Sequence, residues 1–287
     1  MNMVRSASIW LLSRDTLRDE KAALDQRKAN ITYLDWNDVD TPVENPPAVA
    51  RWMMVPEHMV FQLSFMEELE RAGTRVVNTP RAVQTCDKAT IVFLWQRHLK
   101  PVIDMPPTIM TGNINHATRF IDSHDDAILK PIDGQGGKGV KTLIAGNAGN
   151  TAILHDQLAV QGILFVQQRI KTHHEIRTLM VGDEVVAQYA RYNEAGLHNL
   201  ASGGNILPLT DPRVRLSDDH AMMFKKMAKK IKTFTGLDIL ALDVMIDEAK
   251  KPWLLEWNPF FAYGQTKMLG IDIASKIADF TIALSHN

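Results

Sequence analysis

The chain has 287 residues, enough for one large domain or for two or three small ones that share a core. A formal net charge of −1 gives no reason to expect nucleic acid or an anionic membrane as a partner. The single cysteine, Cys86, excludes an intramolecular disulfide. The apolar run from Ile9 to Leu12 is too short for a signal peptide or a membrane span, so we expect a cytoplasmic protein.

The N-terminal part, residues 1–85, has the pattern of a small α/β domain. Short apolar runs predict strands in ASIWLL, ITYLDW, RWMMV and VVN. A helical pattern extends from Pro56 to Gly73, and its apolar face is formed by Met59, Leu63, Met66 and Leu69. Alternation of strands and helices favours a parallel sheet.

The central part, residues 86–166, begins with Asp87, which we expect to cap the helix KATIVFLWQRHL. The strands AILKP and VKTLIA enclose the glycine-rich segment DGQGGKGV. The C-terminal part, residues 167–287, contains EIRTLMV and EVVAQYARY, and Gly182-Asp183 between them predicts a hairpin. A helix over 218–234, stopped by Gly236, precedes two further strands and a final helix.

The glycine-rich segment matches the dinucleotide pattern G-x-G-x-x-G through Gly134, Gly136 and Gly139. A dinucleotide site requires a helix after the loop, whereas VKTLI alternates like a strand, so we reject that interpretation. A hairpin that covers phosphates and an ordinary flexible turn both remain. Lys130 ends the preceding apolar strand, where it either meets an anion or extends to solvent.

Two carboxylates interrupt the apolar strands of ILALDVMIDEAKKPWLLEWNPF. If the turn centres between Ala249 and Lys250, Asp243 lies directly opposite Glu256, and Asn258 points the same way. Two unpaired carboxylates this close repel each other, and a divalent cation such as Mg²⁺ resolves the conflict. The alternative is that each acid pairs with a separate lysine or arginine.

Together, these motifs resemble the ATP-grasp superfamily, with glutathione synthetase and the RimK-type glutamate ligases as the most similar members. The segments AILKPIDGQGGKGV and EIRTLMVGDEVVAQYARYNEAGLHNLASGG are similar to both, and GIDIASKIADF is closer to the RimK type. The resemblance implies an α/β (α+β) ATP-grasp fold with three α/β subdomains, at residues 1–85, 86–166 and 167–287. ATP is then expected between the central and the C-terminal subdomains.

The resemblance also implies roles for individual residues. Contacts with ATP are implied for Lys88, Lys130, Gly134, Gln135, Gly136, Gly137, Gln167, Gln168, Arg169, Ile170, Glu175 and Asn199. Catalytic roles are implied for Lys130, Arg177 and Arg191. Substrate contacts are implied for Arg51, Arg177, Arg191, Asn199 and Gly264. The Mg²⁺ ligands are then Asp243, Glu256 and Asn258, and Mn²⁺ is expected to substitute.

The chain departs from the resembling families at several positions. Leu197 replaces an arginine, Gln168 replaces a glutamate, and Phe260 and Phe261 are bulkier than usual, which suggests an unusual substrate. The implied function is an ATP-dependent carboxylate–amine ligase that adds glutamate to a small-molecule or peptide carboxylate through an acylphosphate. The alternatives are a glutathione-synthetase-like ligase that uses glycine and a catalytically silent ATP-binding protein. A homo-oligomer is compatible with either.

Overall fold

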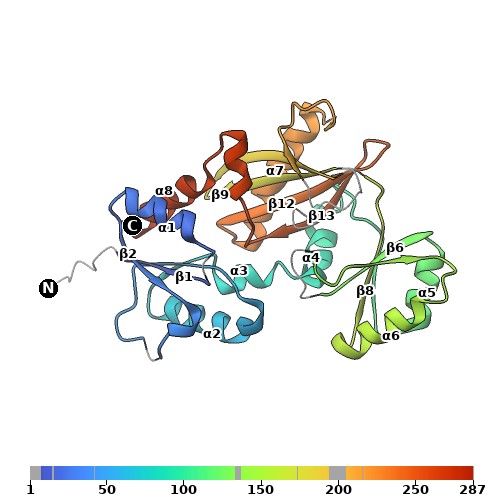
Figure 1. The fold of residues 1–287 in the computed structure, drawn as a ribbon, viewed down its shortest axis with the longest axis horizontal. Helices are drawn as coiled ribbons and strands as arrows, with labels where there is room; N and C mark the ends of the chain where they lie inside the picture. The colour runs from blue at the N-terminus through green and yellow to red at the C-terminus, as the bar shows by residue number, and fades with distance from the viewer. Residues whose placement is uncertain are drawn as a thin grey trace.

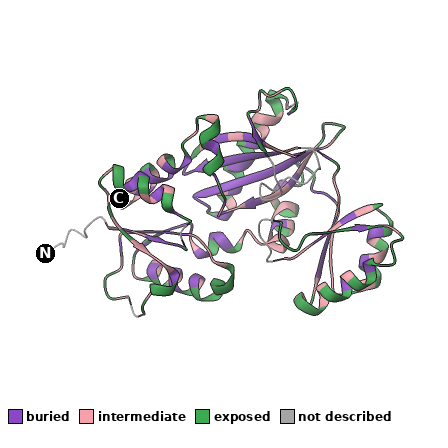
Figure 2. Cartoon of the chain, viewed as in Figure 1, coloured by how far each residue is buried: buried purple, intermediate pink, exposed green. Residues whose placement is uncertain are grey.

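The computed structural model describes residues 8–14, 16–41, 43–132, 137–172, 174–193, 205–214 and 216–286. Within them, three sheets and their flanking helices form three units (Figure 1). The N-terminal unit lies at the left of Figure 1 and the central unit at the right, and a five-stranded sheet lies above and between them. Figure 2 shows that this five-stranded sheet is the most continuously buried part of the fold.

The N-terminal unit is a four-stranded parallel sheet with the order β2-β1-β3-β4. Its elements are β1 (Ser8–Leu12), α1 (Arg18–Gln26), β2 (Asn30–Leu34), η1 (Trp36–Asp38), β3 (Val49–Trp52), η2 (Pro56–His58), α2 (Met59–Arg71), β4 (Arg75–Val77) and α3 (Pro80–Gln84). One face, with Ile9 and Leu11, packs on α1 and on the C-terminal helix α8 (Ile273–Ser285). The opposite face, with Leu12 and Trp52, packs on α2.

Two predictions for the N-terminal unit were partly wrong. The third strand is Val49–Trp52, not RWMMV, because its ladder with β1 ends at the pair Leu12–Trp52 and the next residues leave the sheet toward Pro56. The helix face predicted from Met59 to Leu69 is buried at Met66 and Leu69 only, and Met59 is exposed. The predicted parallel sheet is confirmed.

The central unit is an antiparallel sheet with the order β5-β8-β6-β7. Its elements are β5 (Thr108–Thr111), α5 (Ile114–Asp122), β6 (Asp126–Lys130), β7 (Lys141–Ile144), α6 (Asn150–Gln161) and β8 (Leu164–Gln168). A strand, β7, follows the glycine-rich segment and pairs with β6, as predicted. Ala117, Leu129, Leu154 and Val166 belong to its small core.

The five-stranded sheet has the order β11-β10-β9-β12-β13. Its elements are β9 (His174–Val181), β10 (Glu184–Tyr192), β11 (Asn205–Leu207), α7 (Asp218–Thr235), β12 (Ile239–Ile246), β13 (Pro252–Asn258) and η5 (Gly264–Leu269). α4 (Lys88–Leu94) continues as the π-helical turn η3 (Trp95–Leu99), and Asp87 caps it by accepting a hydrogen bond from Thr90 N. Ile91 and Leu99 from this helix share a core with β12 and α7. The subdomain boundaries at 85/86 and 166/167 stay a prediction, and α4 and α8 pack across them.

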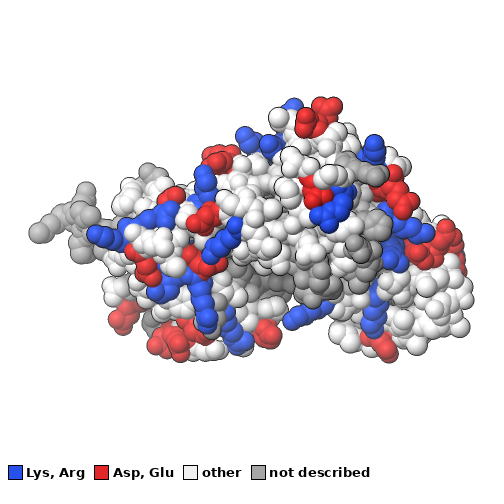
Figure 3. All heavy atoms as spheres, turned by 45° about the horizontal axis from the view of Figure 1, so that its top comes forward, with Lys and Arg blue, Asp and Glu red and all other residues white. Residues whose placement is uncertain are grey.

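Charged side chains of both signs alternate over the face shown in Figure 3. This distribution matches the net charge of −1. In the described part of the chain, no helix is both long and apolar enough to cross a membrane.

Candidate functional site

A row of charged side chains crosses four neighbouring strands of the five-stranded sheet. The directly opposed pairs are Arg191–Glu175 between β10 and β9, Arg177–Asp243 between β9 and β12, and Asp243–Glu256 between β12 and β13. Because alternate residues of a strand share a face, the whole row lies on one side of the sheet. The opposition of Asp243 and Glu256 was predicted from the sequence and is confirmed.

Asp243 and Arg177 form a buried two-pronged ion pair. Arg177 Nε donates to Asp243 Oδ1 at 2.7 Å, and Nη2 donates to Oδ2 at 2.6 Å. Burial raises the pKa of the Asp243 carboxyl, but Arg177 and then Arg191 lower it more, so the net pKa lies below the usual range. Burial lowers the pKa of Arg177, and Asp243 raises it more, to a net value above normal. Asp243 therefore has the arginine partner that the sequence left open as an alternative.

Arg191 bridges two carboxylates. It donates through Nη2 to Glu175 Oε1 and, at 3.3 Å, to Asp243 Oδ2. Its Nε is buried and has no hydrogen-bond partner among the described residues. Glu175, which the resemblance placed near a ribose, is buried and contacts Arg191. The two arginines therefore differ. Arg177 donates from both Nε and Nη2 to Asp243, whereas the Nε of Arg191 has no acceptor among the described residues.

The donor set of Asp243, Glu256 and Asn258 fits a hard divalent cation. Asn258 Nδ2 lies 2.9 Å from Glu256 Oε1 and 3.3 Å from Asp243 Oδ2, so a single electropositive group already bridges both carboxylates. Rotation of the amide by half a turn would place Oδ1 at the same point, which gives three oxygen ligands. The described residues contain no cluster of three or more His, Cys, Asp or Glu that could hold a metal.

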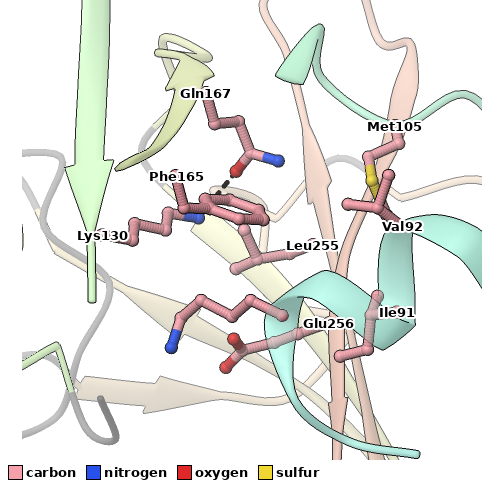
Figure 4. Close-up of a pocket in the computed structure, with 9 residues that line it drawn as sticks. Ile91, Val92, Met105, Lys130, Phe165, Gln167, Leu255 and Glu256 are labelled. Atoms are coloured by element: carbon pink, nitrogen blue, oxygen red, sulfur yellow. Dashed lines mark hydrogen bonds between the residues drawn. The ribbon is translucent and has the colours of Figure 1, made fainter. Parts of the chain in front are cut away.

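A β-bulge re-aims the side chains of β13 beside this row. Asp243 pairs with Glu256, but Val244 pairs with Leu254, so Leu255 is the extra residue. In a regular strand, Leu255 and Glu256 would face opposite sides of the sheet. Here both line the same pocket (Figure 4).

This pocket lies between the central unit and the five-stranded sheet. Its lining consists of Lys88, Ile91, Val92, Met105, Lys130, Phe165, Gln167, Leu255 and Glu256. Lys130 and Glu256 point into it from opposite sides, and Lys130 Nζ donates to Gln167 Oε1 at 2.6 Å (Figure 4). Burial lowers the pKa of Lys130 to about 8, although the nearby Glu256 raises it and Lys88 lowers it further. The pocket thus combines apolar walls with two cations and one anion.

The structure also gathers further predicted ATP contacts near this pocket. Lys88, in the first turn of α4, donates to the carbonyl oxygen of Ile132 at 3.4 Å. Of the predicted hinge residues, only Gln167 has its side chain in the pocket. Gln168, Arg169 and Ile170 line a second, more open hollow together with the β12–β13 turn.

The glycine-rich segment is described only from Gly137, which has a positive φ of 75°. Five positions singled out from the sequence lie outside the described residues: Gly134, Gln135, Gly136, Leu197 and Asn199.

Two predicted substrate residues are not brought to the charged row. Arg51 is buried, and its guanidinium donates to both oxygens of Glu20, at 3.1 and 3.2 Å, and to the carbonyl of Trp52. Tyr263 OH also donates to Glu20, at 2.9 Å. Gly264 begins η5 and is exposed. Their substrate roles stay predictions, and the contacts of Arg51 are those of a structural ion pair.

The apolar walls of the pocket were not among the residues predicted from the sequence. Phe165 lies two residues before Gln167 on β8, so the two-residue period of a strand was an available signal. Leu255 had no such signal, because its orientation depends on the bulge.

Comparison with known proteins defines the family. Residues 85–281 match the model of the RimK-like ATP-grasp domain. The chain is similar to a tetrahydromethanopterin:alpha-L-glutamate ligase of Methanocaldococcus jannaschii, with 29% identity over 272 residues, 84% of this chain and 89% of that protein. It covers 59% of the ligase of the same name from Methanosarcina acetivorans, with 28% identity over 64% of this chain. A glutathione synthetase of Pseudomonas syringae pv. tomato is 29% identical over 63% of this chain and 56% of its own length.

A solved structure has a similar fold over almost the whole chain. The ATP-grasp ligase PsnB, in complex with a phosphomimetic variant of its minimal precursor, Mg and ADP, has a TM-score of 0.74 at 16% identity and covers 98% of this chain and 99% of its own. The chain therefore belongs to the RimK-like ATP-grasp family and has the ATP-grasp fold. The members to which it is similar are ligases. The predicted family and fold are confirmed.

Proposed function

We propose that this protein is an ATP-dependent carboxylate–amine ligase, which adds glutamate to the carboxylate of a small molecule or peptide through an acylphosphate. The observation that carries the proposal is the row Glu175–Arg191–Arg177–Asp243–Glu256 beside the lysine pocket. Together they combine a candidate cation site with the positive charges of Lys88 and Lys130, which phosphoryl transfer requires. The choice of glutamate rests on the similarity to the tetrahydromethanopterin:alpha-L-glutamate ligase.

In this proposal, ATP occupies the pocket between the central unit and the five-stranded sheet. Lys88 and Lys130 bind phosphate oxygens, and Phe165 and Leu255 contact the base. Asp243, Glu256 and Asn258 hold Mg²⁺, which neutralises phosphate charge when bound. Mn²⁺ takes the same ligands.

The first step joins an acceptor carboxylate oxygen to the γ-phosphorus. The bond from the γ-phosphorus to the bridging oxygen breaks, and ADP leaves. Lys130 and Arg191 stabilise the charge of the transferring group, because Arg191 keeps a buried Nε with no partner in the described chain. Arg177 holds Asp243 in position.

In the second step, the amino group of glutamate attacks the acyl carbon. The tetrahedral oxyanion that forms accepts hydrogen bonds from Arg191. The bond from the acyl carbon to the phosphate oxygen then breaks, phosphate leaves, and the nitrogen loses a proton. No nucleophilic side chain of the protein is required.

The test uses ATP, MgCl₂, a pool of carboxylates and a pool of amino acids, with the products identified by mass spectrometry. An acceptor labelled with ¹⁸O in its carboxylate is expected to transfer one ¹⁸O to the released phosphate. Release of AMP, or phosphate without label, would overturn the acylphosphate mechanism.

A second candidate is a ligase that uses glycine, favoured by the similarity to the Pseudomonas syringae glutathione synthetase. The same assay with glutamate or glycine as sole amine separates the two. A protein that binds ATP but forms no product with any amine would be the catalytically silent alternative.

A further inference from the structure

The N-terminal sheet has a topological switch point between β1 and β3. The strand order is β2-β1-β3-β4, and the helix that follows β1 packs on one face while the helix that follows β3 packs on the other. The loops after these two neighbouring strands therefore diverge. In open parallel sheets, a ligand crevice lies at this position, outside the carboxyl ends of the strands.

Three polar side chains converge at this edge, one from the loop after each of β1, β2 and β3. Arg14 follows β1, Asn37 follows β2, and His58 follows β3. Arg14 Nη2 donates to Asn37 Oδ1 at 3.4 Å and contacts His58 Nε2 at 3.3 Å. Because arginine has only donors, His58 Nε2 accepts this bond, and neither of these two partners of Arg14 is a carboxylate.

Within the described residues, the hydrogen bonds of Arg14 therefore bring no negative charge to its guanidinium. Among the described residues, Arg14 forms no ion pair with a carboxylate. Two other exposed arginines of this unit, in contrast, have carboxylate partners. Arg71 pairs with two glutamates, and Arg75 pairs with Asp238. The two partners of Arg14 fix its guanidinium in place and leave it available to an external anion.

An aromatic cluster, of which Trp36 and Trp52 are buried, links this edge to the charged row. Phe260 lies two residues after Asn258, is only partly buried, and stacks edge-on against Trp52 with ring centroids 5.0 Å apart. Trp36, which precedes Asn37, lies 6.2 Å from Trp52. Asn78, at the end of β4, donates to the carbonyl of Ile239 at 2.8 Å and holds the start of β12 against this edge. In Figure 1, β12 and β13 extend from the side of the central unit toward the N-terminal unit.

We propose that Arg14, Asn37 and His58 bind an anionic group of the acceptor, a carboxylate or a phosphoryl group remote from the reacting carboxylate. The section of the acceptor between its two anionic ends then passes Phe260, whose ring is partly exposed and rests on the buried Trp52. The acceptor is thus an elongated molecule, of the length of a short peptide, with an acidic far end. This inference rests on the proposed ligase function, because the reacting carboxylate is placed at the charged row.

The test compares three peptides that differ at the far end: succinyl-Ala-Ala-Glu, acetyl-Ala-Ala-Glu and phosphoseryl-Ala-Glu. Their dissociation constants are measured by calorimetry on the full chain with Mg²⁺ and a non-hydrolysable ATP analogue. The succinyl or the phosphoseryl peptide is expected to bind about tenfold tighter than the acetyl peptide, because a charge-assisted hydrogen bond is gained. Which of the two binds more tightly identifies the anion.

Arg14→Gln is expected to abolish the difference between the charged peptides and the acetyl peptide. Arg71→Gln removes the same charge from the same unit, away from the crevice, and should preserve the difference. Equal affinities in the wild-type protein, no binding of any peptide, or discrimination retained in Arg14→Gln would each overturn the proposal. A protein that discriminates but forms no amide with any amine would instead contradict the ligase function alone.

Discussion

Arg177 on β9 donates two hydrogen bonds to Asp243 on the adjacent strand β12, and both side chains are buried. The same carboxylate is a proposed Mg²⁺ ligand, so Asp243 has two separable tasks. One is to neutralise a buried guanidinium, and the other is to bind the cation beside Glu256. The neighbouring Glu256 has no such arginine partner among the described residues, and its carboxylate accepts from Asn258.

Asp243→Asn and Glu256→Gln should therefore differ in stability while both lose activity. Asp243→Asn leaves Arg177 buried without its counter-charge, which is expected to cost about 3–5 kcal/mol in the free energy of unfolding. Glu256→Gln should lower turnover at least tenfold with little change in the melting temperature. Urea unfolding and steady-state kinetics measure the two effects. Equal destabilisation by both variants would contradict this division of roles.

Lys130 should make nucleotide binding sensitive to pH near 8. Its pKa is lowered to about 8 in the folded protein, so the ammonium group loses its proton as the pH rises through this value. ATP affinity of the free enzyme is expected to fall between pH 7 and pH 9.5. Over the same range, the contribution of Lys130 to the free energy of unfolding should rise, because the unfolded chain binds the extra proton.

The matched control for this pH dependence is Lys130→Arg, since arginine stays charged throughout the range. Calorimetric titration with ATP and Mg²⁺ at each pH provides the measurement. An affinity of the wild-type protein that stays constant to pH 9.5 would refute the assignment.

Leu254 and Leu255 are adjacent, yet we expect their substitution by alanine to affect different properties: protein stability for Leu254 and nucleotide binding for Leu255. Leu254 is fully buried in the core with Trp257, so Leu254→Ala should cost about 2–5 kcal/mol of stability. Leu255 lines the pocket, so Leu255→Ala should weaken nucleotide binding by about tenfold and leave the melting temperature nearly unchanged. Thermal unfolding with and without an ATP analogue distinguishes them. A large loss of stability in Leu255→Ala would mean that the bulge does not aim this side chain into the pocket.

The cluster of Glu20, Arg51 and Tyr263 should act on stability. Glu20→Gln leaves Arg51 buried with a neutral partner and is expected to cost about 3–5 kcal/mol. Tyr263→Phe removes only one hydrogen bond to Glu20 and should cost about 1 kcal/mol. Chemical unfolding measures both. If either variant raised the KM for the acceptor without a change in stability, the substrate role suggested for Arg51 by the family resemblance would gain support.

The hairpin that carries Asp243 and Glu256 was predictable because a short turn fixes the register of both strands. The pairs nearest the turn are centred on Ala249, half a residue earlier than predicted, and the bulge at Leu255 restores the predicted pairing at Asp243. A bulge leaves no simple mark in the sequence, so the orientation of Leu255 could not be foreseen.

The ion pair between Arg177 and Asp243 could not be predicted for a different reason. These residues are 66 positions apart, and their opposition depends on β9 and β12 being neighbours in the sheet. No local turn connects the two strands. The pairing of Arg191 with Glu175, in contrast, belongs to one hairpin, and only the small register shift between Val185 and Ala187 separates it from simple counting.

Helix α8, the last helix of the chain, packs against the first strand. Ile277 and Ala278 share a core with Ile9 and Leu11, and Asp279 pairs with Arg27. During synthesis, this face of the N-terminal sheet is therefore covered only in part, by α1, until α8 has been made. A fragment that ends before α8 is accordingly expected to aggregate, and proteolytic removal of α8 should destabilise the N-terminal sheet, at the opposite end of the sequence.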